Sequence, residues 1–173
     1  SWTDVQLPGN RTWTQDLSEI PRWVEPLVWD KEDRLHALWS EGQQLKLGTT
    51  NDYGKSWDEY TVVQSADTVY FPYMEISDYG ILCTWVSGFN QHIKHHAAVI
   101  ALEDGKFNTY ELEPQKLDIW SRFAVGEYGR ATGGEYFPII QLSNGNFGMV
   151  TTIQNSKTNR LGFTWWELVL SRF

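Results

Sequence analysis

The stretch VYFPYMEISDYGILCTWV at residues 69–86 has two related copies elsewhere in the chain. These are WVEPLVWDKEDRLHALWS at residues 23–40 and EYFPIIQLSNGNFGMVTT at residues 135–152, and the three align without a gap on Pro26, Pro72 and Pro138. Each copy has an apolar run, a short group of turn-forming residues and a second apolar run. The pattern predicts a strand, a tight turn and a second strand in each copy, with the turns at 30–33, 77–80 and 143–146.

Further strands are expected after each copy. Trp39 and Trp85 lie at the same offset from their prolines and are each followed by a small or polar group that ends in glycine. Alternating runs then predict a third strand in every copy and a fourth strand in the first two. The predicted third strands are 44–49, 93–102 and 160–170, and the predicted fourth strands are 57–63 and 106–112.

The fold class follows from this repeat. Helical periodicity is nearly absent, so the chain is expected to be all-β. Four antiparallel strands that recur at intervals of 46 and 66 residues between the prolines are typical of β-propeller blades. We expect one domain with about three blades, at 22–63, 68–113 and 134–173, and with 1–21 as a closing strand segment. A β-sandwich is the alternative.

Composition excludes several classes of partner. The chain has 173 residues, enough for one domain with a buried core, and a formal net charge of −8. A negative surface repels nucleic acid and anionic lipid, and no apolar run approaches the length of a membrane span. We therefore expect a soluble protein without nucleic-acid or membrane partners. Because the chain lacks an initiator Met, we expect it to be either a processed protein or an artificially chosen segment, and a processed chain would fit a secreted or periplasmic protein. The sequence does not specify the compartment.

The sequence predicts no metal site and no cofactor. Cys83 is the only cysteine, which excludes an internal disulfide and a thiolate cluster. In the run QHIKHHAAV, His92 and His96 would share one strand face about 13 Å apart, with His95 on the other face. Such histidines cannot converge on one zinc ion without ligands from elsewhere. We interpret them as structural or surface residues.

The segment TNDYGKSW at residues 50–57 resembles the Asp-box, S/T-x-D-x-G-x-x-W, of sialidases and bacterial neuraminidase repeat proteins. The matching residues are Thr50, Asp52, Gly54 and Trp57. Asp52 can accept hydrogen bonds from its own turn, Gly54 can take a positive φ and Trp57 can cover the hairpin. The residues and the resemblance both predict a structural role, because the family's box lies between third and fourth strands and away from the active site.

Turn parity predicts where a ligand would bind. Successive turns of an up-and-down sheet alternate between its two ends, so the Asp-box shares an end with the turns between first and second strands. The other end collects the turns between second and third strands and the links between copies. Sialidase-like propellers bind glycans on the face opposite the box, so parity and resemblance predict the same binding face.

The longest predicted link carries most of the candidate ligand residues. The third copy begins 66 residues after the second, about 20 more than the first interval of 46, and extra length in a compact repeat is commonly a binding loop. Aromatic rings there can stack on sugars, and guanidinium groups can hold an acidic substituent. The candidate ligand-binding residues are Trp120, Arg122 and Arg130 in this link, with Arg22, Trp23 and His92 on the same predicted face.

Catalysis of the sialidase type would need an activated tyrosine with a carboxylate partner and an acid for the leaving group. Tyr128, Glu127 and Glu135 are the candidate catalytic residues. However, Glu127 and Tyr128 are adjacent in sequence, and adjacent side chains of an extended chain point in opposite directions. The family's N-terminal F/Y-R-I-P signature is absent, and the chain encodes three blades where catalytic sialidases use six. We therefore expect glycan binding, with glycoside hydrolysis and a non-catalytic assembly scaffold as alternatives.

Three blades cannot close a ring alone. Two chains would supply six, and twofold symmetry is the commonest form of oligomer. We expect a homodimeric six-bladed propeller in which an N-terminal segment, 3–7 or 12–17, adds the strand missing from the third copy. A fragment of a longer chain and an open stack of three sheets are the alternatives.

Overall fold

The computed structural model describes residues 7–9, 26–87, 94–112, 139–155 and 160–169. These residues form eleven β-strands, and no helix occurs among them, which confirms the predicted all-β class. No described segment therefore offers a helix that could cross a membrane. The strands are β1 (Leu27–Trp29), β2 (Leu35–Glu41), β3 (Gln44–Thr50), β4 (Asp58–Gln64), β5 (Val69–Ser77), β6 (Gly80–Ser87), β7 (Lys94–Glu103), β8 (Lys106–Leu112), β9 (Ile139–Gln141), β10 (Phe147–Asn155) and β11 (Arg160–Leu168).

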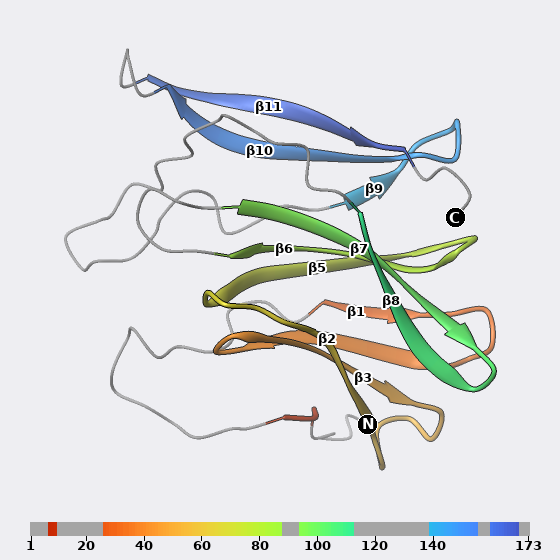
Figure 1. Ribbon diagram of the computed structural model, residues 1–173. Helices are drawn as coiled ribbons and strands as arrows, with labels where there is room; N and C mark the ends of the chain where they lie inside the picture. Colours follow the sequence, from red (N-terminus) through yellow and green to blue (C-terminus); the bar gives the residue numbers. More distant parts are fainter. Residues whose placement is uncertain (1–6, 10–25, 88–93, 113–138, 156–159, 170–173) are drawn as a thin grey trace, which may run out of the picture.

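The strands form three separate antiparallel sheets, one for each copy of the repeat. The first sheet has the order β1-β2-β3-β4, the second β5-β6-β7-β8, and the third β9-β10-β11. Each strand pairs with its neighbour in sequence, so each sheet is an up-and-down meander. Figure 1 shows the sheets stacked face to face, with the second between the other two. All predicted strands in the described residues are confirmed, with ends displaced by one or two residues.

The central sheet is covered on both faces, which explains why its strands are apolar on both sides. Cys83 and Trp85 of β6 pack with Leu38 and Leu47 of the first sheet in one cluster. Leu82, on the opposite face of β6, belongs to a second cluster. This cluster also contains Val99 of the central sheet and Ile139 and Phe147 of the third sheet. The alternation of strand side chains therefore places successive β6 residues in different interfaces.

The three copies differ in the register of their first hairpin. In the first sheet Trp29 pairs with Leu35 across a five-residue loop, and in the third sheet Gln141 pairs with Phe147 in the same way. In the second sheet Ser77 pairs with Gly80 across two residues only. The second strands of the three sheets therefore occupy equivalent positions in the ungapped alignment. In the central sheet, the residues of β5 next to the turn are shifted by one position relative to β6.

A bulge in β5 absorbs this one-position shift, because two residues of β5 but one residue of β6 separate the pair Tyr70–Val86 from the pair Tyr73–Thr84. The register of β5 and β6 shifts between Tyr70 and Tyr73, and Phe71 within the shift has a φ of 50°. Pro72 follows directly, and proline within sheets is found mainly at bulges and edges because it cannot donate a hydrogen bond. The Phe-Pro pair therefore bends β5 close to its first residue.

The stack has two ends, and the loops are distributed between them as the turn parity predicted. The β1–β2 loop and the β5–β6 turn lie at one end, where the Lys31 ammonium is 3.3 Å from the Asp78 carboxylate. The loop between β3 and β4, called the Asp-box loop below because of its sequence resemblance, is there too, since Tyr53 contacts Trp29 with ring centroids 6.0 Å apart. We call this the Asp-box end; it is on the right in Figure 1.

The other end, called the opposite end below, holds the β2–β3 turn and the link from β4 to β5. These two segments are joined by hydrogen bonds. The Ser65 amide donates to the Gln43 carbonyl at 2.8 Å, the Val69 amide donates to the Gly42 carbonyl at 2.9 Å, and the Gln43 side chain donates to the Ala66 carbonyl at 2.7 Å. The link between the first two sheets is therefore fixed to the first sheet rather than projecting freely.

The described part of the N-terminal segment, residues 7–9, lies against the first sheet. A Cβ built on Gly48 would come within 2.7 Å of the Pro8 ring, with Trp39 and Trp57 at 3.1 and 3.2 Å. Gly48 therefore leaves the space that Pro8 and the two indole rings fill. The closing strands predicted at 3–7 and 12–17 lie, apart from Leu7, outside the described residues.

Candidate functional site

The Asp-box hairpin has the structure predicted from its residues. The Asp52 carboxylate accepts hydrogen bonds from the Ser56 amide at 3.0 Å, the Ser56 hydroxyl at 2.7 Å and the Thr50 hydroxyl at 2.7 Å. Gly54 has a φ of 82° and donates its amide to the Thr50 hydroxyl oxygen. These four residues thus close the turn between β3 and β4.

Hydrogen bonds also set the protonation of Asp52. Bonds from the Ser56 side chain and amide, followed by that from Thr50, hold the pKa of the Asp52 carboxyl well below its usual range. A carboxylate that stays ionised in this way cannot supply a proton to a leaving group near neutral pH. The Asp-box therefore acts as a structural fastening of the first sheet.

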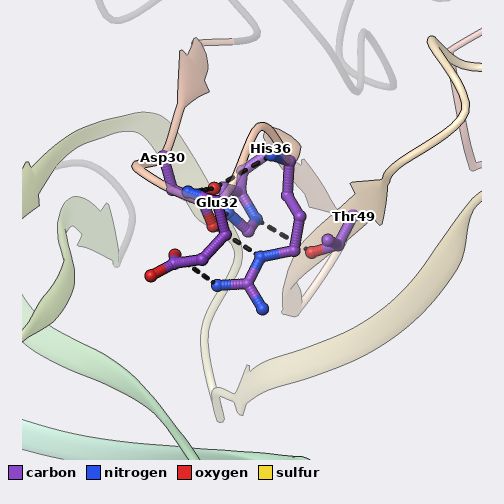
Figure 2. A network of polar contacts seen from close by, with 5 residues as sticks. Asp30, Glu32, His36 and Thr49 are labelled. Atoms are coloured by element: carbon purple, nitrogen blue, oxygen red, sulfur yellow. Dashed lines mark hydrogen bonds and ion pairs between the residues drawn. The ribbon is translucent and has the colours of Figure 1, made fainter.

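A second polar network lies beside it at the Asp-box end (Figure 2). The Asp30 carboxylate accepts from the amides of Glu32 and Arg34, each at 2.9 Å, and from the Arg34 guanidinium at 2.6 Å. Nε2 of the buried His36 lies 2.8 Å from the same carboxylate, and its Nδ1 lies 2.9 Å from the Thr49 hydroxyl. One carboxylate thereby ties the β1–β2 loop to β2 and β3.

The protonation states of this network follow from burial and hydrogen bonding. Burial opposes ionisation of Asp30, but bonds from His36, Arg34 and Glu32 outweigh it and lower its pKa to about 2. Burial also lowers the pKa of His36, although Asp30 acts in the other direction. An ionised carboxylate only accepts, so His36 donates from Nε2 and the Thr49 hydroxyl donates to Nδ1.

The order Thr49, His36, Asp30 is that of a nucleophile, a base and an orienting acid. However, Thr49 and His36 are both buried, and Asp30 is already bonded to two backbone amides of its own loop. No substrate atom can reach the hydroxyl in this arrangement. We therefore interpret the network as a structural connection between loop and sheet.

Acid is expected to destabilise the protein in two stages. Burial lowers the pKa of His36, His95 and His96, with that of His95 falling from 6.5 to about 4. The unfolded chain then binds protons first, so stability is lost as the pH falls from 6.5 towards 4, by on the order of 3 kcal/mol for His95 alone. Asp30 adds a further loss from 3.8 down to about 2.

Urea unfolding measured at a series of pH values tests this expectation. The variant His95→Gln removes the largest of the histidine contributions, so its stability should vary less between pH 6.5 and 4 than that of the unchanged chain. A free energy of unfolding that stays constant over this interval in the unchanged chain would contradict the assignment of neutral, desolvated histidines.

The opposite end holds a different polar cluster, formed by Trp85 and Ser87 of β6 and His96 of β7. Nε2 of His96 lies 2.7 Å from the Ser87 hydroxyl. The imidazole ring stacks on the Trp85 indole, with centroids 5.1 Å apart and planes inclined by 3°. Strand pairing produces this contact, because Trp85 and His96 are directly opposite each other in the ladder. We call these three residues the Trp-Ser-His cluster.

The charges of two carboxylates and one ammonium group act on the His96 ring of this cluster. Burial lowers the pKa of His96, while the charges of Glu111 and Asp67 act to raise it and that of Lys94 acts to lower it. A serine beside a histidine is one half of a nucleophilic site. Ser87 is buried, however, and no carboxylate in the described ranges is hydrogen bonded to the His96 ring. The described contacts of the cluster therefore connect the end of β6 to the start of β7.

The β5 bulge lies at the same end of the stack. A positive φ at a bulky residue such as Phe71 is strained, and strain of this kind is concentrated at functional sites. Phe71 and Tyr73 both pack against Val86 and Met149, between the second and third sheets. The opposite end therefore combines the strained strand with the Trp-Ser-His cluster.

The remaining candidate residues lie outside the described residues. This applies to the candidate ligand residues Trp120, Arg122, Arg130, Arg22, Trp23 and His92, and to the candidate catalytic residues Tyr128, Glu127 and Glu135. Their roles stay predictions. Of the sites predicted from sequence, the structure describes the Asp-box residues Thr50, Asp52, Gly54 and Trp57.

Sequence reasoning did not identify Ser87 and Trp85 as neighbours of His96. The signal was available, because the predicted second and third strands are antiparallel and joined by a short connection. Counting outward from that connection places both β6 residues next to the start of β7. As predicted, His95 and His96 occupy opposite faces, since they pair with Val86 and Trp85.

Metal binding finds no support in the described part of the chain, where no group of three or more histidine, cysteine or acidic side chains could hold an ion. Cys83 is buried in the central sheet, and burial raises the pKa of its thiol to about 12. Comparisons of the chain with protein-family models, with curated proteins and with solved structures find no significant match.

Proposed function

We propose that this protein binds glycans at the opposite end of a sialidase-like β-propeller, of which the three sheets are blades. One observation carries the proposal: the Asp-box hairpin joins the third and fourth strands of a four-stranded meander that packs on the central sheet, and the central sheet in turn packs on the third. Sialidase-like blades carry their box at this position. The first strands of successive sheets also contact each other, β1 with β5 and β5 with β9, as inner strands do around a propeller axis.

The assembly that we propose is a six-bladed ring of two chains. Support comes from the number of sheets in one chain and from the three-stranded third sheet in the described residues. An open stack would leave apolar sheet faces in water.

The ligand is proposed to be a carbohydrate with an acidic substituent. Trp120 and Trp23 would stack on the apolar faces of sugar rings, and Arg122 and Arg130 would hold the acidic group through paired hydrogen bonds. The Trp-Ser-His cluster and the β5 bulge lie at the end of the stack where these residues are predicted. The Asp-box end is occupied by the two structural networks described above.

Binding is favoured over hydrolysis. Three described carboxyl groups have lowered pKa values and stay ionised near neutral pH. Asp30 and Asp52 belong to the structural networks, and Glu167 accepts hydrogen bonds from Asn146 and Asn144. None of them can act as the acid that a glycosidase requires. The candidate catalytic residues Tyr128, Glu127 and Glu135 remain the place where hydrolysis would be sought.

The binding proposal predicts selective loss of glycan affinity. The unchanged chain is applied to an array carrying sialylated, sulfated and neutral glycans, and acidic glycans should be retained. Arg130→Ala and Trp120→Ala should each weaken binding about tenfold or more, since a charge-assisted hydrogen bond or a ring stack is worth on the order of 1–3 kcal/mol. Lys31→Ala is the matched control, because it removes an exposed charge at the Asp-box end.

Two results would contradict the proposal. One is the absence of binding to any glycan by a folded chain. The other is an equal loss of binding in Lys31→Ala, which would place the ligand at the Asp-box end. A separate assay tests for hydrolysis. If the chain released a fluorogenic aglycone from a sialoside and Tyr128→Phe abolished the release, the function would be hydrolysis rather than binding.

A further inference from the structure

Each end sheet of the stack has one face that no described sheet covers. We call the face turned towards the next sheet along the chain its front, and the other its back. The back of the first sheet bears Leu27 and Trp29, which are 49% and 50% exposed. The front of the third sheet bears Ile140 and Trp165, both 51% exposed. Large apolar side chains are thus in water at both ends of the row of sheets.

Strand pairing fixes these assignments. Leu27 and Val28 are neighbours in β1 and pair with Ala37 and His36 respectively. The Val28 side chain packs with the central sheet. Leu27 therefore points away from that sheet. In the third sheet Ile139 packs with the central sheet, so Ile140, its neighbour, points away from it.

Equivalent positions of the repeat show what these faces lack. Leu27 and Ile139 each follow the proline of their copy by one residue and both point backwards. Ile139 is only 6% exposed because the central sheet lies behind it, whereas Leu27 is 49% exposed because no described sheet does. Val28 and Ile140, two residues after the proline, show the converse on the front faces: Val28 packs with the central sheet, and Ile140 is exposed. The exposed residues are apolar at positions that a further sheet would bury.

We propose that these two faces bind each other between two copies of the chain, so that the front of each third sheet covers the back of the partner's first sheet. This inference rests on the proposed propeller and identifies its closing interface. Within the chain, front meets back twice, from first to second sheet and from second to third. A third contact of the same kind continues an interface that already exists, and a twofold axis makes it occur twice and closes the ring.

The contact is expected at the inner strands. Within the chain, the first strand of each sheet contacts the first strand of the next. By continuation, Ile140 of β9 meets Leu27 of β1 in the second copy. The outer part of the first sheet's back is already occupied, since Pro8 lies over Gly48 and Lys46 pairs with Glu41 at 2.9 Å. The free area is therefore the inner part, where Leu27 and Trp29 lie.

Analytical ultracentrifugation of the unchanged chain at micromolar to about 100 micromolar concentration tests the interface. The expected mass is twice the 20.1 kDa of one chain. Leu27→Lys and Ile140→Glu should each raise the dimer dissociation constant about 100-fold or more, because each buries a charge against an apolar residue. The double variant should recover dimerisation, because the introduced ammonium of one copy then meets the introduced carboxylate of the other at both contacts.

Leu102→Glu is the control, since Leu102 is an exposed apolar residue of the central sheet, which takes no part in the proposed contact. It should leave the dissociation constant unchanged. A folded chain that remains at 20.1 kDa over the whole range overturns the inference. So does a dimer that both single variants leave intact, or that Leu102→Glu weakens equally.

Glycan binding is measured separately on the same samples. A dimer that binds no glycan supports the interface and contradicts the proposed ligand. A monomer that binds acidic glycans contradicts the interface and supports the ligand. The two proposals can therefore fail independently.

Discussion

Replacing Trp85 with alanine is expected to lower the free energy of unfolding by about 3–5 kcal/mol, the usual loss for a buried tryptophan. Trp85 is 2% exposed and packs with Leu38 and Leu47 between the first and second sheets. It also covers one face of His96. Its loss should open a cavity in the largest apolar cluster and admit water to the imidazole, so the pKa of His96 should rise towards its ordinary value.

Urea unfolding gives the first quantity and the titration of the His96 ring proton signals gives the second. Tyr79→Ala serves as a control, because Tyr79 is an exposed aromatic residue in the β5–β6 turn of the same sheet. It should cost less than about 1 kcal/mol. A similar cost in the two variants would contradict the placement of Trp85 between the sheets.

Gly80→Ala is expected to be similarly damaging, with a loss of roughly 3 kcal/mol or more, for a backbone reason. Gly80 has a φ of 129° at the end of the two-residue turn that begins at Ser77. A Cβ there would lie 2.4 Å from the Ile100 carbonyl oxygen and 3.2 Å from the Ala101 Cα. Both neighbours are backbone of β7, so relief requires the second sheet to shift.

Gly42→Ala is the matched control for this variant. Gly42 also has a positive φ, of 60°, in the β2–β3 turn, but a Cβ there meets nothing within 4 Å. It should cost only about 1 kcal/mol, the penalty of the left-handed conformation. Thermal unfolding of the two variants separates them. Equal losses would show that the φ angle, rather than the approach of β7, determines the effect.

The strands and their grouping could be predicted from sequence because the apolar runs are short and the repeat is strong. Alignment on Pro26, Pro72 and Pro138 predicted the correct second strands in all three sheets. The Asp-box turn was predicted in its detail, since Asp52 and Gly54 act through bonds within eight residues of chain. Local chemistry of this kind can be deduced from neighbouring residues.

Features that depend on contacts between distant residues could not be predicted in this way. The register shift of the central hairpin and the positive φ of Phe71 belong to a strand that packs between two sheets, and its neighbours there are distant in sequence. The bond between His36 and Thr49 joins residues 13 positions apart, and no motif announces it. The Trp-Ser-His cluster was missed for a different reason, because His96 was assessed as a metal ligand rather than by strand pairing.

The meander order of the strands has a consequence for how the protein folds. Every strand pair in the described residues joins neighbours in sequence, so each sheet can form from local contacts before any two sheets meet, which favours fast folding for a β-protein. The second sheet, apolar on both faces, is then the species most exposed to aggregation until its neighbours arrive. The first sheet, already formed when a chain is synthesised from its N-terminus, would be in place to shield one of those faces.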